Sequence, residues 1–140
     1  MKKATKLLNM LILLFPFLCI GCKHRPFENL PALRTAERLV STNPDSALSI
    51  LKHVPYPERL DDETFAHWCM LSGKVTDKIN ASILPTFYLD RALKWYVNNG
   101  TQEEQVQMKL YLGRSYVTDG NYDKAMAIYI NALEMAEKNK

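Results

Sequence analysis

The chain has 140 residues, 47% of them hydrophobic and 24% charged, which fits one folded domain or a short repeat array and excludes fibrous and disordered proteins. The 18 basic residues exceed the 15 acidic ones, but Lys2, Lys3 and Lys6 account for this surplus. The remaining chain is formally neutral, which argues against the basic surface of nucleic-acid-binding proteins.

The first 22 residues have the layout of a secretory signal. Three lysines precede a mostly apolar run from Leu7 to Ile20. A transmembrane helix needs about 20 apolar residues, and this run is shorter and is interrupted by Asn9 and Pro16. A signal peptide is therefore favoured over a spanning anchor, which is the alternative.

The end of this segment, Cys19-Ile20-Gly21-Cys22, resembles the lipobox of bacterial lipoproteins, in which a small residue precedes a cysteine that is lipidated and becomes the new amino terminus. Cys19 stands where that family usually has leucine, although Leu18 is adjacent. The alternative is an ordinary cleaved signal, but the A-x-A-like site that this would need is missing. The resemblance implies lipidation of Cys22 and a location in the bacterial cell envelope, anchored to a membrane and facing the periplasm or the exterior.

The mature chain divides into a short tether, residues 23–30, and a helical region, residues 31–140. From Pro31 onward, apolar residues recur at helical spacing, and the breaks fall at capping residues and prolines. We find no segment with strand periodicity longer than four residues. The sequence therefore predicts an all-α domain of three antiparallel helix pairs: 31–42 with 44–54, 62–79 with 84–98, and 102–118 with 122–138.

Capping residues locate most of these helix ends. Asn43 is expected to cap the helix that starts at Pro44, since proline is tolerated at the first helical position. Asp61 is expected to cap the next long helix. Gly100 ends the second pair, and Thr101 with Glu104 forms a capping box that starts the third.

The second and third pairs share a pattern at an offset of 41 residues: Trp68, Leu71, Ser72 and Val75 align with Lys109, Leu112, Gly113 and Tyr116. This resembles the tetratricopeptide repeat, W-x2-L-G-x2-Y followed by A-x3-F and a later alanine and proline. Pro85 occupies an alanine position of the motif, so the helix after it is expected to start late. The first pair matches least, through Ala47 and Leu51. The remaining matches are Ala92 in the second pair and Gly120, Ala125, Tyr129 and Ala132 in the third.

The resemblance implies a right-handed solenoid whose first helices line a concave groove. Gly113 and Ala132 would let the helices of the third pair approach closely, while Leu112, Tyr116 and Tyr129 fill the surrounding space.

A groove of this kind commonly holds a peptide or a partner helix, so the sequence predicts a membrane-anchored scaffold that binds a protein partner. The alternatives are a sensing segment of a larger signalling protein and, third, a glycan-binding lipoprotein. The open last helix also suggests self-association. The candidate groove residues are Ala66, Met70, Gly73 and Asp77 from the second pair and Gln107, Leu110, Tyr111 and Arg114 from the third.

No catalytic constellation is apparent. His24, His53 and His67 lack metal-ligand spacing, and the sequence has no glycine-rich phosphate loop or nucleophile motif. Cys69 lies in an apolar helical stretch, where a cysteine usually behaves as a small buried hydrophobe. We therefore expect no enzyme activity, no cofactor, no metal and no nucleic-acid partner.

Overall fold

The computed structural model describes residues 30–138, which form a row of helices with no strand among them. The predicted all-α class is confirmed. The predicted signal peptide, Cys22 and the tether as far as residue 29 lie outside the described residues. The elements in chain order are α2 (Pro31–Leu39), α3 (Pro44–Lys52), the 3-10 helix η3 (Pro57–Arg59), α4 (Asp62–Lys78), α5 (Thr86–Asn99), α6 (Gln102–Thr118) and α7 (Tyr122–Glu137).

The helix ends differ from the predicted ones mainly next to prolines. α6 has the predicted bounds, whereas α2 stops at Leu39 rather than at residue 42. Pro44 disfavours helical backbone at Asn43, which lies outside α2 with ψ 76° although its N–H still donates to the carbonyl of Leu39 over 2.8 Å. α5 starts at Thr86, because Pro85 has extended backbone with ψ 146°. This confirms the late start that Pro85 predicted.

The predicted caps are present. The Asn43 side chain accepts from the backbone N–H of Ser46 over 3.1 Å, and Asp61 accepts from that of Thr64 over 3.0 Å. The reciprocal capping box of Thr101 and Glu104 opens α6. These local bonds explain why the helix starts could be predicted from the sequence alone.

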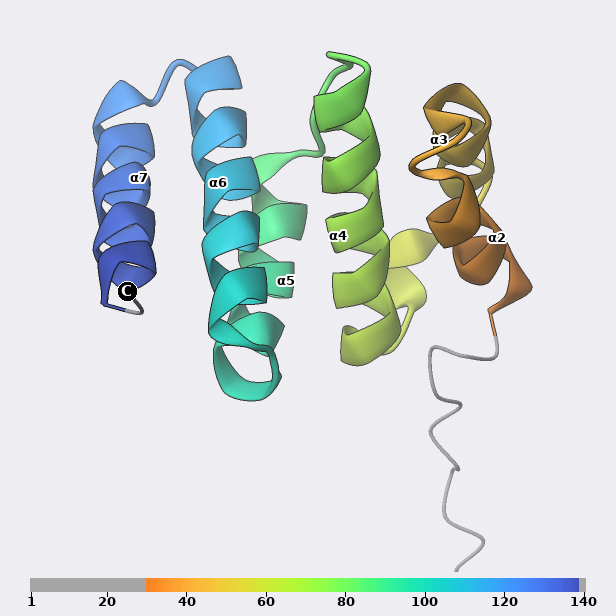
Figure 1. Ribbon diagram of the computed structural model, residues 1–140, viewed down its shortest axis with the longest axis horizontal. Helices are drawn as coiled ribbons and strands as arrows, with labels where there is room; N and C mark the ends of the chain where they lie inside the picture. Colours follow the sequence, from red (N-terminus) through yellow and green to blue (C-terminus); the bar gives the residue numbers. More distant parts are fainter. Residues whose placement is uncertain (1–29, 139–140) are drawn as a thin grey trace, which may run out of the picture.

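The helices pack in chain order. α2 packs on α3, α4 on α5 and α6 on α7, while α3 contacts α4 and α5 contacts α6. The first helices of successive pairs are also in contact, α2 with α4 and α4 with α6. Figure 1 shows the resulting row, with α2 and α3 at one end and α7 at the other. Its core is a chain of buried side chains that includes Leu33, Leu51, Phe65, Val75, Leu89, Tyr96, Met108 and Leu112.

A glycine allows the close packing of α6 on α7. A Cβ atom built on Gly113 would overlap the ring of Tyr129, and Ala125 and Ala132 on α7 are both buried. Glycine in a helix interior destabilises by about 1 kcal/mol relative to alanine. Here the missing side chain leaves room for an aromatic ring, as the sequence predicted.

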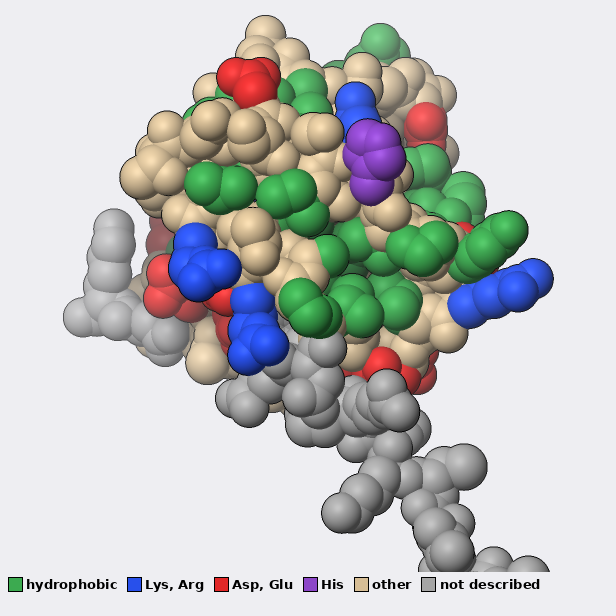
Figure 2. Space-filling view, turned by 90° about the vertical axis from the view of Figure 1, so that its right-hand side faces the viewer, with side chains coloured by type: hydrophobic (Ala, Val, Ile, Leu, Met, Phe, Trp, Pro, Cys, Tyr) green, Lys and Arg blue, Asp and Glu red, His purple; other side chains and the backbone are tan. Residues whose placement is uncertain are grey.

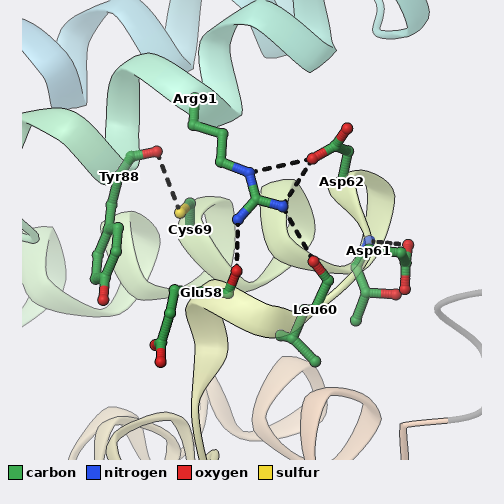
Figure 3. A network of polar contacts seen from close by, with 8 residues as sticks. Glu58, Leu60, Asp61, Asp62, Cys69, Tyr88 and Arg91 are labelled. Carbon is green, nitrogen blue, oxygen red and sulfur yellow. Dashed lines mark hydrogen bonds and ion pairs between the residues drawn. The ribbon is translucent and has the colours of Figure 1, made fainter.

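Two polar contacts tie the second pair to the first. The buried indole Nε1–H of Trp68 donates to the carbonyl of Leu51 over 3.0 Å, which joins α4 to α3. On the outer side, Arg91 of α5 donates to the carbonyls of Glu58 and Leu60, each over 3.0 Å, and to Asp62 over 2.7 Å (Figure 3). Arg91 therefore fastens the segment between α3 and α4 onto α5.

Candidate protein-binding surfaces

The predicted groove residues lie on α4 and α6, but half of them are buried. Ala66, Met70 and Tyr111 have at most 4% of their surface exposed, and Gly73 is also buried. These four residues pack between neighbouring helices. The expectation that they line an open groove is corrected, because motif positions alone do not fix how closely successive first helices approach.

Tyr111 illustrates the cause. A Cβ on Gly73 would overlap the Tyr111 ring, so the ring of α6 lies on the bare backbone of α4. Burial, together with the charge of Asp77, raises the pKa of Tyr111 to about 12, although a hydrogen bond with Gln107 and the charge of Arg114 act in the opposite direction. Tyr111 thus serves the packing between repeats and offers little surface to a partner.

Asp77 and Arg114 form an ion pair with each other. Arg114 Nη2 also donates to the carbonyl of Ala81 over 2.6 Å, so the arginine connects α6 to the turn that follows α4. The Asp77 side chain is 56% exposed and that of Arg114 27%. A partner at this edge would meet a charge pair that is already satisfied internally, with Asp77 the more accessible member.

Sequence reasoning missed an acidic region around His67. Glu37 of α2, Glu63 of α4 and Glu104 of α6 each favour the charged form of His67, while Lys74 opposes them. Burial outweighs these carboxylates and lowers the pKa of His67 below its usual value of 6.5. One carboxylate from each first helix therefore acts on His67, a relationship that only the packing of the helices could reveal.

The largest group of exposed apolar side chains lies on α6 and α7. Tyr122, Met126, Ile130 and Leu133 of α7 are 50–67% exposed, and their spacing of four, four and three residues places them on one side of the helix. Leu110 and Val117 of α6 are 46% and 43% exposed. The spacing in α7 could have been noticed in the sequence, but not which of its apolar sides packs against α6.

The exposed apolar side chains of α6 lie next to those of α7. Gly113 of α6 lies against the ring of Tyr129 of α7, and Lys109 of α6 donates to Asn131 of α7. At the amino-terminal end of α6, a shallow hollow is lined by Gln102, Glu103 and Val106 together with Ala136 of α7. We call the surface formed by Leu110, Val117, Tyr122, Met126, Ile130 and Leu133 the α6–α7 apolar face.

The opposite end of the row has a different character. Figure 2 views the end formed by α2 and α3, where basic side chains lie beside hydrophobic ones. A shallow hollow on α2 is lined by Pro31, Thr35 and the charged residues Arg34, Glu37 and Arg38. Among the described residues of this end, Tyr56 is the large hydrophobic side chain that is mostly exposed.

The remaining candidate for chemistry, Cys69, is fully buried, and its Sγ lies 3.7 Å from the carbonyl oxygen of Tyr88 (Figure 3). Burial raises the pKa of this thiol, and the charge of Arg91 acts in the opposite direction. The described residues contain no group of His, Cys, Asp or Glu that could hold a metal ion.

Comparison of the chain with protein-family models, with curated proteins and with solved structures gave no match. Within residues 30–138, none of the helices combines the length and the apolar character needed to cross a bilayer.

Proposed function

We propose that this protein is a membrane-anchored, extracytoplasmic scaffold of the tetratricopeptide-repeat type, which binds a protein or peptide partner across the face shared by α2, α4 and α6. The observation that carries the proposal is the succession of contacts along the row, of α2 with α4 and of α4 with α6. Such a succession of first helices makes one continuous surface, suited to an extended segment.

The repeat motif supports the solenoid part of the proposal. Gly113 and Ser72 occupy the same motif position, and Gly113 accommodates a ring from the second helix of its own pair. Trp68 of the motif is buried and bonded to the preceding pair. These are the close contacts that a right-handed solenoid of this type needs between its helices.

The charges that act on His67 bear on the kind of partner. Glu37, Glu63 and Glu104 lie near His67, whereas Lys74 is the cation that acts on it. A partner's terminal carboxylate would be repelled at this end of the face. We therefore propose binding through the partner's internal residues, without a preference for a free carboxyl terminus.

Affinity capture of the full chain from detergent-extracted membranes, with mass spectrometry of co-purifying proteins, tests this function. A double variant, Glu37→Lys with Lys74→Glu, reverses charges on the shared face. The matched control, Lys94→Glu, reverses an exposed charge on α5. The proposal predicts a partner that is retained by wild type and the control and lost from the folded double variant; a partner retained equally by all three would contradict it.

A further inference from the structure

The α6–α7 apolar face corresponds to a surface that is covered elsewhere in the same molecule. Cys69 and Thr76 of α4 are 0% and 2% exposed. The residues 41 positions later in α6, Leu110 and Val117, are 46% and 43% exposed. The second pair, α4 and α5, is covered by α6, which packs against both helices. Within the described residues, no element covers the third pair, α6 and α7, in the same way.

The second helices show the same contrast. Leu93 of α5 is 9% exposed, while Leu133, at the corresponding place in α7, is 59% exposed. α7 uses one apolar side, with Ala125 and Ala132, against α6. Its other apolar side contains Met126 and Ile130. A helix with two apolar sides is typical of one that lies between two neighbours.

We propose that the occupant of the α6–α7 apolar face is a second copy of this chain, related by a two-fold axis, with α7 packed antiparallel on α7 of the other copy. A two-fold interface places the same patch of both copies in contact. Apolar side chains would then cover apolar side chains, and α6 and α7 of both copies would form a four-helix arrangement.

The other way to join two copies is head to tail, with α2 of one copy on the α6–α7 apolar face of the next. The outward side of α2 carries Arg34 and Arg38. Burying these charges against Met126 and Ile130 would be unfavourable. These charges on α2 therefore favour the two-fold arrangement over an open-ended chain of copies.

The helix dipole favours the antiparallel direction. Asp123 lies in the first turn of α7, Glu137 is its last residue and Lys138 directly follows it. With Ile130 on the axis, an antiparallel pair brings Asp123 of each copy opposite Glu137 and beside Lys138 of the other, so these charges largely offset one another. A parallel pair would align the two helix dipoles unfavourably.

The exposed area suits a dimer of modest stability. Six large apolar side chains, each 43–67% exposed, present a few hundred Å² of apolar surface, at about 100 Å² for a whole side chain. A standard interface buries about 800 Å² on each partner, roughly half of it apolar. The α6–α7 apolar face supplies most of that apolar share.

The test is the molar mass of the full chain in a non-ionic detergent, measured by light scattering and sedimentation velocity over a concentration series. We expect a monomer–dimer equilibrium for wild type. Met126→Glu with Ile130→Glu should weaken dimerisation at least tenfold with unchanged helical circular dichroism. Val97→Glu, at a 53% exposed position on α5, is the matched control and should dimerise like wild type.

A zero-length carbodiimide cross-link between Asp123 and Lys138 tests the direction. Fifteen helical residues span about 22 Å, so this link cannot form within one copy and its detection shows antiparallel pairing. A wild-type monomer at all concentrations, a dimer that the double variant leaves intact, a dimer without this cross-link, or a series of ever larger species would each overturn the proposal. Because Glu37 and Lys74 are unchanged in these variants, the result is independent of the proposed partner-binding function.

Discussion

The Tyr129 ring of α7 lies where a side chain at Gly113 of α6 would have to be. Gly113 is therefore needed for close approach rather than for an unusual backbone angle, since it sits inside a regular helix. The gain in packing against the ring outweighs the intrinsic disadvantage of glycine in a helix.

Gly113→Leu should lower the free energy of unfolding by about 1–3 kcal/mol or more, because the added side chain must displace the ring. Gly113→Ala should also destabilise, although alanine is the better helix former. Chemical denaturation measures both changes. In a Tyr129→Ala background the effect of Gly113→Leu should shrink, since the clash is removed; an equal effect in both backgrounds would contradict the assigned contact.

The hydrogen bond from Trp68 to the carbonyl of Leu51 is buried, so its loss leaves an acceptor without a partner. Trp68→Phe is expected to lower the unfolding free energy by about 1–3 kcal/mol. Trp95→Phe is the control, because Trp95 is only half-buried, and it should have a smaller effect. Urea unfolding followed by circular dichroism compares the two; similar losses would argue against a special role for the buried bond.

Arg91 and Asp62 should respond unequally to substitution. The Asp62 side chain is 71% exposed, so Asp62→Asn should cost less than about 1 kcal/mol. Arg91→Lys should cost more, about 1–2 kcal/mol, because an ammonium group cannot reproduce the planar donors that reach Asp62 and the carbonyls of Glu58 and Leu60. Thermal unfolding of both variants tests the order, and the reverse order would contradict this account.

His67 should make the protein less stable in mild acid. Burial lowers the folded pKa of His67 below 6.5 despite Glu37, Glu63 and Glu104. Below the unfolded pKa, the unfolded chain therefore binds more protons at His67 than the folded chain does. The contribution of neutral His67 to the free energy of unfolding is thus complete above about pH 6.5 and is lost as the pH falls toward the folded pKa.

Unfolding free energies of wild type and His67→Gln, measured between pH 7.5 and 5.5, test this prediction. The wild type should lose more stability over this range than the variant. An equal or steeper loss of stability in His67→Gln would show that the three carboxylates, and not burial, determine the pKa of His67.

Local chemistry accounts for what could be predicted from the sequence. Asn43, Asp61 and Thr101 cap helices through bonds to residues three positions away, and such spacing is visible in the chain. The candidate binding surfaces depend instead on the distances between neighbouring helix pairs. Tyr111 is buried because Gly73 happens to face it, which the repeat offset does not reveal.

The same reasoning explains what was missed. The carbonyls bound by Arg91 precede it by 31 and 33 residues, and neither is identifiable as an acceptor in the sequence. In α7 the apolar spacing is visible, but it is compatible with either side packing on α6. Only the position of the Tyr129 ring on Gly113 decides which side is left exposed.

The lipid anchor stays a prediction, because Cys22 lies outside the described residues. Cys22→Ser should abolish incorporation of radiolabelled fatty acid and leave the precursor unprocessed, whereas Cys69→Ser should retain the label, since the Cys69 side chain is buried. Acyl chains stabilise membrane association by about 0.8 kcal/mol per buried CH₂, and more than one is needed for stable anchoring. We therefore expect wild type to remain in the membrane fraction at high salt. A wild-type protein that is cleaved, unlabelled and released would contradict the lipobox assignment and favour an ordinary signal peptide.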